Sequence, residues 1–239
     1  MITDALVARN RAFYNALWSK SYLTRPERFN TWALLSPLLP EAPARLEIGP
    51  GLRPRLPIAG THFVDLSPPA VASLQAAGGL AQVGEITALP FADQTFELVT
   101  AFDVVEHVTD DERALSELTR VLKPGGRLIL SIPLHSARWT PFDALVGHSR
   151  RYEPAALQVL LAHHGLNVER SGAFGMKAKN PGLLYLTVKG LTRRHTFAVH
   201  CYNWLFLPLG LLFQKPLTFT DGLMDLTEVD EVLLVCRKS

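Results

Sequence analysis

The sequence predicts an α/β protein whose mostly parallel sheet is covered by helices on both faces. Short apolar segments alternate with amphipathic ones along most of the 239 residues, which is the pattern of strand–helix–strand units. Residues 96–102 are apolar on both faces of the expected strand, as in a strand buried within a parallel sheet. Hydrophobic residues make up 48% of the chain and charged ones 19%, so a large core can be buried.

The expected elements follow from apolar runs bounded by glycine and proline. Seven strands are expected, at residues 46–48, 62–64, 80–83, 96–102, 127–132, 167–172 and 231–237. Helices are expected at residues 2–20, briefly around Trp32, and at 68–77, 110–122 and 154–164. Pro68 or Pro69 suits a first helical turn, and the glycines at 78–79 and 125–126 suit helix stops. These elements predict one α/β domain.

That domain carries additions at both ends. We expect an N-terminal helical cap at residues 1–43, a core at 44–174 and a hydrophobic insertion or lid at 175–230. Residues 231–239 then return as the final strand of the core.

Composition excludes several classes of protein. The 24 Lys+Arg against 22 Asp+Glu give a net charge of +2, too even for a general nucleic-acid binder. Cys201 and Cys236 are the only cysteines and form no cluster with histidine, so neither a disulfide scaffold nor a metal site is expected. Asp4, Arg9 and Arg11 interrupt any apolar leader, which favours a cytoplasmic location.

A glycine turn follows the first expected strand. Gly49 and Gly51 would let a ligand approach the backbone closely, and Asp65 ends the next strand with a carboxylate suited to ribose hydroxyls. A dinucleotide site needs a third glycine and a full helix after the turn, but the segment continues through Pro54 and Pro57. The pattern therefore favours a nucleoside with an amino-acid tail, S-adenosylmethionine (SAM), over NAD.

Six segments in this order resemble the class I SAM-dependent methyltransferases, most closely the small-molecule branch with a methyltransferase-11-like domain. They are EIGPG at 47–51, VDLS at 64–67, GEI at 84–86 before LPF at 89–91, FELV at 96–99, VVEHV at 104–108 and RVLKPGG at 120–126. The resemblance covers about residues 44–174 and the final strand. It implies a Rossmann-like fold with a seven-stranded, mostly parallel sheet, a methyl-transfer enzyme and SAM as cofactor.

The resemblance also implies roles for single residues in cofactor binding. The matching positions are Glu47, Gly49, Gly51, Asp65, Leu66, Glu85, Ile86, Phe102 and Asp103. Asp65 matches the acid that binds ribose, and Glu85 with Ile86 matches the edge that holds adenine. The sequence departs from the family at Arg53 and Pro54, where a third small residue is common, so Arg53 could itself face the carboxylate of the methionine tail.

Three histidines are candidates for a general base, which methyl transfer needs only if the acceptor must lose a proton. His107 lies in the family's Glu-His-Val segment, where an architectural role is equally open. His135 follows a strand end, and His148 lies in a segment that suits either a substrate wall or a loop tied to acidic residues. The pair at 163–164 is expected to end a helix.

Residues 195–214 contain no Asp, Glu, Lys or Arg. This apolar window could be a lid, a dimer surface or a membrane-surface contact helped by Lys189, Arg193 and Arg194, and by length alone it could span a bilayer. With Phe13, Tyr14 and Trp18, an insertion placed before the last strand would enclose an apolar acceptor.

Taken together, these patterns predict SAM-dependent methylation of a small, apolar molecule, with oxygen favoured over nitrogen or carbon. No nucleic-acid partner is expected, and the oligomeric state is left open. The alternatives are a SAM- or nucleoside-binding module without transfer activity, and a NAD-binding oxidoreductase.

Overall fold

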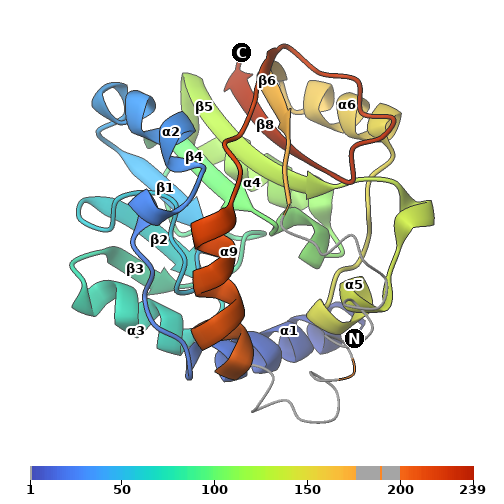
Figure 1. Cartoon of the computed structure of the whole chain (residues 1–239). Helices are drawn as coiled ribbons and strands as arrows, with labels where there is room; N and C mark the ends of the chain where they lie inside the picture. The colour runs from blue at the N-terminus through green and yellow to red at the C-terminus, as the bar shows by residue number, and fades with distance from the viewer. Residues whose placement is uncertain (1, 176–188, 190–199) are drawn as a thin grey trace.

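The computed structural model describes residues 2–175, 189 and 200–239, and its centre is one mixed sheet (Figure 1). The strands are β1 (Arg45–Ile48), β2 (Thr61–Asp65), β3 (Leu80–Val83), β4 (Phe96–Phe102), β5 (Leu122–Pro133), β6 (Leu166–Ala173), β7 (Thr220–Asp221) and β8 (Glu231–Lys238). Their order across the sheet is β3-β2-β1-β4-β5-β8-β6-β7. All seven predicted strands are present. Within the described residues the sheet has eight strands, because the two-residue β7 adds to its edge.

The strand directions place one edge of the sheet where a site can form. Strands β1 to β5 pair in parallel, and β8 lies antiparallel between β5 and β6. The carboxyl ends of β1, β2, β4 and β5 therefore meet at the same edge. In open sheets of this kind ligands bind outside the carboxyl ends of the strands.

Helices lie on both faces of the sheet and across that edge (Figure 1). They are α1 (Ile2–Trp18), η1 (Pro26–Arg28), α2 (Trp32–Leu35), η2 (Ser36–Glu41), α3 (Pro68–Ala76), η3 (Val105–His107), α4 (Asp111–Val121), η4 (Ser136–Arg138), α5 (Pro141–Val146), α6 (Pro154–His163), η5 (Tyr202–Phe206) and α9 (Leu207–Phe213). The predicted helices at 2–20, 68–77, 110–122 and 154–164 are each found within two residues of the expected ends.

Local signals set several helix boundaries. The Asp110 carboxylate accepts a hydrogen bond of 2.9 Å from the backbone N–H of Arg113, which caps the N-terminus of α4. The stop expected at 125–126 lies inside β5 instead, because Phe96 pairs with Leu122 whereas Leu98 pairs with Arg127. The four residues between them leave the ladder as a bulge, where Gly125 has a φ of +72°.

Two apolar layers enclose the sheet and confirm that both faces are covered. Val99, Leu128 and Leu234 pack with Leu115 and Leu118 of α4 on one face. On the other face the buried group consists of Leu34, Leu35, Ala42, Leu56, Leu98, Ile129, Leu233 and Val235. Alternate residues of one strand thus serve opposite layers, as the alternation of side chains along a strand requires.

The additions at the two ends of the chain lie at the edge with the carboxyl ends. Figure 1 shows α1 running across the ends of the strands and α9 in front of the sheet. Part of the predicted insertion at 175–230, including Arg193, Arg194 and residues 195–199 of the apolar window, lies outside the described residues. The proposed domain bounds therefore stay predictions. Among the described residues, the helices are all too short or too polar to cross a membrane.

Candidate active site

A cavity of about 270 Å³ opens at the carboxyl ends of β1, β2 and β4. This is close to the lower size limit of small-molecule sites. Eight of the nine residues predicted to bind a cofactor line it: Glu47, Gly49, Asp65, Leu66, Glu85, Ile86, Phe102 and Asp103. The structure thus brings together side chains that are up to 56 residues apart in the sequence.

The two glycines of the turn after β1 are needed for different neighbours. Gly49 has a φ of +64°, and a Cβ on it would lie 2.8 Å from a methyl carbon of Val104. Gly51 has a φ of +54°, and a Cβ on it would lie 2.2 Å from the indole ring of Trp18. Trp18 thus covers Gly51, the predicted residue that does not line the cavity. Neither position accepts a side chain without movement of its neighbour.

Glu47 holds the loop that follows this turn. Its carboxylate is 1% exposed and accepts hydrogen bonds of 2.9 Å from the backbone N–H groups of Arg55 and Leu56. Burial nevertheless raises the pKa of Glu47 to about 7. The loop has no helix between β1 and β2, in agreement with the short crossover that the prolines predict.

Asp65 joins the ends of β1 and β2. Its two carboxylate oxygens accept hydrogen bonds of 2.8 Å from the backbone N–H groups of Gly51 and Ser67. Burial raises the pKa of Asp65 to about 6. A carboxylate has about four lone-pair positions, so two backbone donors leave acceptor capacity for the hydroxyls of a bound nucleoside.

The side of the cavity formed after β3 combines an acid with an apolar neighbour. Ile86 is buried at 5% exposure, whereas the Glu85 carboxylate is half exposed and lies 3.7 Å from the guanidinium of Arg11 on α1. This ion pair ties α1 to the cavity wall. A purine fits such an edge, because its ring needs apolar contact and its exocyclic amine needs an acceptor.

Asp103 at the end of β4 is held in an unusual backbone conformation. Its φ is +53°, in the left-handed region that side chains other than glycine rarely adopt. Its N–H donates to Ser131 Oγ at 2.8 Å, and that hydroxyl donates to Asp103 Oδ1 at 2.7 Å. Ser131 on β5 therefore fixes where the carboxylate lies in the cavity. Strain of this kind is often found at functional sites.

His107 is the one of the three candidate histidines that lines the cavity. Its Nδ1 lies 3.2 Å from the carbonyl oxygen of Gly147, and its Nε2 lies 3.3 Å from the hydroxyl of Tyr14. Burial and the neighbouring His148 lower the pKa of His107 to about 3. The ring is therefore neutral at physiological pH. Donation from Nδ1 to the carbonyl leaves Nε2 as the acceptor on the side of Tyr14.

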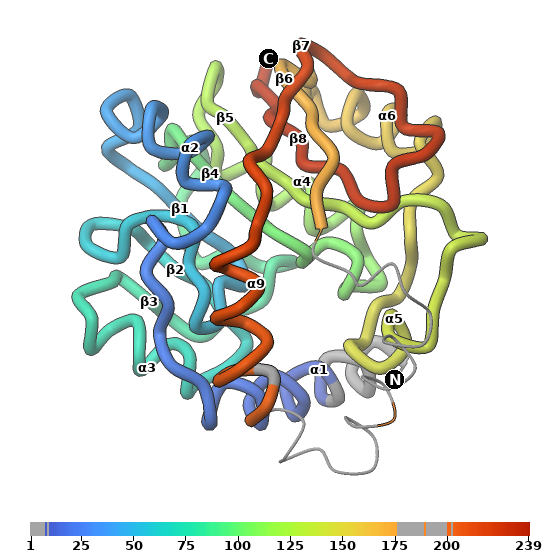
Figure 2. The backbone as a smooth tube through the Cα atoms, in the orientation of Figure 1, coloured from blue at the N-terminus to red at the C-terminus, as the bar shows by residue number. Residues whose placement is uncertain are grey.

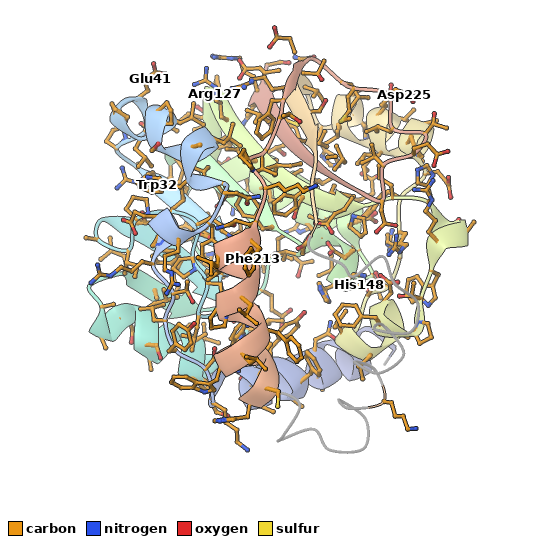
Figure 3. All side chains as sticks on the ribbon, viewed as in Figure 1. Trp32, Glu41, Arg127, His148, Phe213 and Asp225 are labelled. Atoms are coloured by element: carbon orange, nitrogen blue, oxygen red, sulfur yellow. The ribbon has the colours of Figure 1, made fainter. Side chains whose placement is uncertain are left out.

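His148 lies on the loop after α5, where Figure 3 labels it, and its ring packs against that of His107. Its Nδ1 is 3.1 Å from Asp143 Oδ1, its Nε2 is 3.6 Å from Glu106 Oε1, and the ring centroids of the two histidines are 4.6 Å apart. Asp143 also contacts the buried guanidinium of Arg151 at 3.1 Å. The segment from 148 onward is thus tied to acidic residues, one of the two arrangements that the sequence left open.

His135 lies away from the cavity lining. It precedes η4 with a φ of +60°, and its Nε2 is 2.9 Å from the carbonyl oxygen of Leu226. The catalytic role suggested for it stays a prediction, without support from this position. His164, by contrast, ends α6 as expected, with His163 as its last residue.

Two groups of side chains in the described residues could hold a metal ion by distance alone. Glu106, His107 and His148 form one, and Glu112, His163 and His164 form the other, with ligand atoms within 4.8 Å of one another in each. The first group is engaged by Gly147, Tyr14 and Asp143 in the contacts above. The expectation of no metal stays a prediction.

The sequence did not single out Asn10, Arg11 or Ser131 for the site. Asn10 Nδ2 donates to the carbonyl oxygen of Gly147 at 3.3 Å, so α1 contacts the loop that holds His107. Tyr14 and Trp18 were expected near the acceptor and do line the cavity. A polar residue on an amphipathic helix carries no pattern of its own, so Asn10 could not have been distinguished from a solvent-facing residue.

The structure connects the late apolar segment to the same cavity. Arg53 lines the cavity and donates from Nη2 to Asn203 Oδ1 at 2.9 Å. Its guanidinium also lies 5.1 Å from the ring centroid of Trp18. Arg53 therefore bridges the turn after β1 to both covering elements, α1 and η5.

Comparisons with known proteins agree with this fold. Residues 48–130 match the family model described as a methyltransferase domain. A demethylmenaquinone methyltransferase of Streptomyces avermitilis is 48% identical over 59 residues, 25% of this chain and 25% of that protein. A ubiquinone/menaquinone biosynthesis C-methyltransferase of Klebsiella pneumoniae is 56% identical over 64 residues, 26% of each protein. The matches thus span about a quarter of these relatives' length.

Solved structures extend the likeness over the whole fold. A SAM-dependent methyltransferase from Thermotoga maritima superposes with a TM-score of 0.57 and 18% identity, covering 97% of this chain and 91% of that one. At this identity the likeness concerns the fold alone.

Proposed function

We propose that this chain, which belongs by its domain and its fold to the class I SAM-dependent methyltransferases, transfers a methyl group from SAM to a small apolar acceptor. The family and the cofactor predicted from the sequence are confirmed at this level. The observation that carries the proposal is one cavity that combines Asp65, Glu85 and Ile86 on one side with Asp103 and His107 on the other.

The lining fits SAM. Asp65 offers acceptor positions to ribose hydroxyls, Glu85 and Ile86 offer an edge to adenine, and the positive φ of Gly49 lets the ligand approach the backbone. When bound, SAM would supply a methyl group already activated by a sulfonium. We assign Arg53 to the carboxylate of the methionine tail, because its guanidinium lines the cavity beside the glycine turn.

Apolar and aromatic side chains support an apolar acceptor. Tyr14, Trp18, Phe102 and Val104 line the cavity together with the polar groups already described. The named activities of the quinone-modifying relatives agree with such an acceptor, although one of them is a C-methyltransferase. We propose oxygen as the methylated atom, because a histidine is placed to receive a proton from a hydroxyl.

In this proposal His107 orients the acceptor and then takes its proton. The neutral ring offers the Nε2 lone pair to the acceptor hydroxyl, in the place now taken by the hydroxyl of Tyr14. A base of low pKa does not remove the proton in advance. The proton passes to Nε2 only as the oxygen gains its bond to carbon and becomes strongly acidic. His148 acts as a positioning residue, since its ring packs on His107 and is itself held by Asp143.

A second candidate is a SAM- or nucleoside-binding module without transfer activity. Two observations favour it: Arg53 and Pro54 stand where the family usually has a small residue, and Trp18 covers Gly51. Cytoplasmic location and the lack of a nucleic-acid partner stay predictions from the sequence.

Transfer of a labelled methyl group from SAM to a panel of apolar phenols and hydroquinones tests the proposal, with polar alcohols and amines as the comparison. We expect turnover with apolar hydroxyl acceptors, reduced about 100-fold in His107→Ala if it supplies general-base catalysis. SAM binding measured in parallel should be retained in that variant. Binding without turnover on any acceptor would favour the module, and turnover restricted to polar acceptors would contradict the apolar site.

A further inference from the structure

We propose that the outer face of η5 and α9 docks on an anionic lipid bilayer. This docking face consists of Trp204, Leu205, Phe206, Leu209, Leu212 and Phe213. The proposal concerns where the chain binds and does not depend on which reaction it catalyses.

The first observation is a concentration of exposed apolar side chains. Six of the ten large hydrophobic residues that are exposed in the described part of the chain belong to the docking face. Leu212 and Phe213 are 73% and 75% exposed, and Phe213 marks the end of α9 in Figure 3. Single exposed apolar residues are ordinary, but a contiguous group marks a surface that is covered by something else.

The second observation is that the opposite side of α9 is anchored. Leu207 and Leu211 are buried against Phe29, and Gln214 accepts a hydrogen bond of 2.8 Å from the backbone N–H of Asn30. Figure 2 shows the segment before Asn30 running alongside α9. This contact uses the inner side of α9. The docking face therefore cannot turn inward unless the packing of Leu207 and Leu211 on Phe29 is lost.

The helix geometry makes the docking face protrude. Tyr202–Phe206 form a π-helical turn, and Pro208, which lacks an N–H, cannot bond to the carbonyl of Trp204. Asn203 and Leu207 are buried, and the three successive residues between them, Trp204, Leu205 and Phe206, are more than half exposed. The outward-facing residues of a helix packed on its own domain are normally polar, whereas those of this segment are large and apolar.

The charges around the docking face select an anionic membrane as its partner. Residues 200–214 carry no Asp, Glu, Lys or Arg, while Arg25, Arg28 and Lys215 are exposed in the adjoining segments with Glu27 as the one acid among them. The ring centroids of Tyr22 and Trp204 are 5.2 Å apart, which places the segment after α1 beside the docking face. Apolar aromatic residues with a cationic rim are the composition of interfacial membrane anchors.

A second copy of the chain fits less well. A twofold dimer brings the same patch of two subunits together, so the three cations of each rim would meet those of the other. Anionic headgroups instead neutralise the rim while the acyl region receives the apolar side chains.

The position of the docking face has a consequence for the acceptor, which rests on the proposed function. Asn203 on η5 accepts from Arg53, and Arg53 lines the cavity. An apolar acceptor dissolved in the bilayer would thus reach the cavity beside the surface that binds the membrane.

Co-sedimentation of the full chain with vesicles tests the docking face. We expect binding to vesicles of phosphatidylcholine with phosphatidylglycerol, weaker binding to phosphatidylcholine alone, and loss of the difference at high salt. Leu212→Ser/Phe213→Ser should lower the partition coefficient at least about tenfold, since two apolar side chains no longer insert. Val159→Ser is the matched control, because Val159 on α6 is also apolar and 70% exposed but does not belong to the docking face. This variant should leave vesicle binding unchanged. Arg25→Gln/Arg28→Gln should remove the preference for the anionic lipid.

Equal binding by Leu212→Ser/Phe213→Ser and the unchanged chain would overturn the proposal, as would no vesicle binding at all. A dimer in light-scattering measurements that Leu212→Ser/Phe213→Ser converts to monomer, with no effect of vesicles, would assign the face to a second copy. SAM binding by the variants shows that they are folded. Methyl transfer without vesicle binding would contradict the docking face but not the proposed function. Vesicle binding without methyl transfer would contradict the proposed function but not the docking face.

Discussion

The floor and the cover of the cavity are held by different forces. The floor, formed by the ends of β1, β2 and β4, is fixed by buried carboxylates that accept backbone N–H groups, as at Glu47 and Asp65. The cover, formed by α1 and η5, meets it through aromatic packing of Trp18 and through exposed or half-exposed polar pairs such as Arg11 with Glu85.

Substitutions in the floor should therefore be severe, whereas substitutions in the cover should only adjust function. When a buried carboxylate loses its hydrogen-bond partners, no water is available to replace them. The floor should therefore tolerate few substitutions. Exposed pairs contribute little, and packing between helices can relax. Four predictions test this contrast.

The largest effect is expected in the buried ion pairs next to His107, where Asp143 contacts both His148 and Arg151. Asp143→Ala leaves the guanidinium of Arg151, whose side chain is 1% exposed, without its buried partner. Its other contacts are to the partly exposed Asp230 at 2.9 Å and to the carbonyl oxygen of Leu134 at 3.0 Å. We expect the free energy of unfolding in urea to fall by about 3–5 kcal/mol.

The control is Arg138→Ala, which removes the exposed pair with Glu228 and should cost less than about 1 kcal/mol. Equal losses in both variants would break the contrast.

A second effect concerns pH. The pKa of Glu47 is raised to about 7 by burial, so between its ordinary value of 4.5 and 7 the folded chain holds a proton that the unfolded chain has released. This contribution to stability is complete below pH 4.5 and is lost as the pH rises through 7. Relative to Glu47→Gln, the unfolding free energy of the unchanged chain should therefore fall over this window, by up to about 3 kcal/mol.

Urea titrations at several pH values measure that difference. Glu27→Gln, which removes a carboxylate from an exposed position, is the control measured in parallel. A constant difference for Glu47→Gln would mean that the carboxylate is ionised throughout, held by its backbone donors.

The third effect concerns the glycine turn. Gly51→Val places a branched side chain on a residue with a positive φ, which strains the backbone. The new side chain also clashes with the ring of Trp18. We expect the affinity for SAM to fall at least about 100-fold, or about 2.8 kcal/mol, in calorimetric titrations. Gly51→Val/Trp18→Ala should recover part of the loss, because the clash is relieved and the backbone strain is not. No recovery would assign the whole effect to the backbone.

The smallest effect is expected in the cover. Trp18→Ala should change the affinity for SAM by less than about tenfold, since the floor keeps its polar contacts. Trp139→Ala, at an exposed position after η4, is the control and should have no effect. A loss as large as that of Gly51→Val would show that Trp18 forms part of the binding surface proper.

The same contrast explains what could be predicted from the sequence. Residues of the floor are constrained by backbone geometry and by charge at a strand end, so Gly49, Asp65 and Glu85 stand in recognisable motifs. The seven strands and their order of appearance were recognisable for the same reason. A two-residue edge strand such as β7 has no apolar pattern, and the bulge within β5 depends on pairing that a local motif does not encode.

For the cover, only the presence of apolar and aromatic residues could be predicted from the sequence, and not their contacts. The apolar run at 195–214 and the aromatic residues of α1 indicated enclosing elements, but amphipathic spacing does not say which residue meets which. Asn10 reaches Gly147 across 137 positions of sequence, and Ser131 meets Asp103 only because β4 and β5 are neighbours. Among the histidines, placement in the cavity separates His107 from His135 and His148, and spacing along the chain could not.

Calorimetric titration with SAM, S-adenosylhomocysteine and NADH, for the unchanged chain and Asp65→Ala, would show whether the cavity at the strand ends binds SAM. We predict micromolar binding of SAM and its demethylated product, loss of both in Asp65→Ala, and no binding of NADH. Binding of NADH in preference to SAM, or undiminished SAM binding by Asp65→Ala, would contradict this prediction.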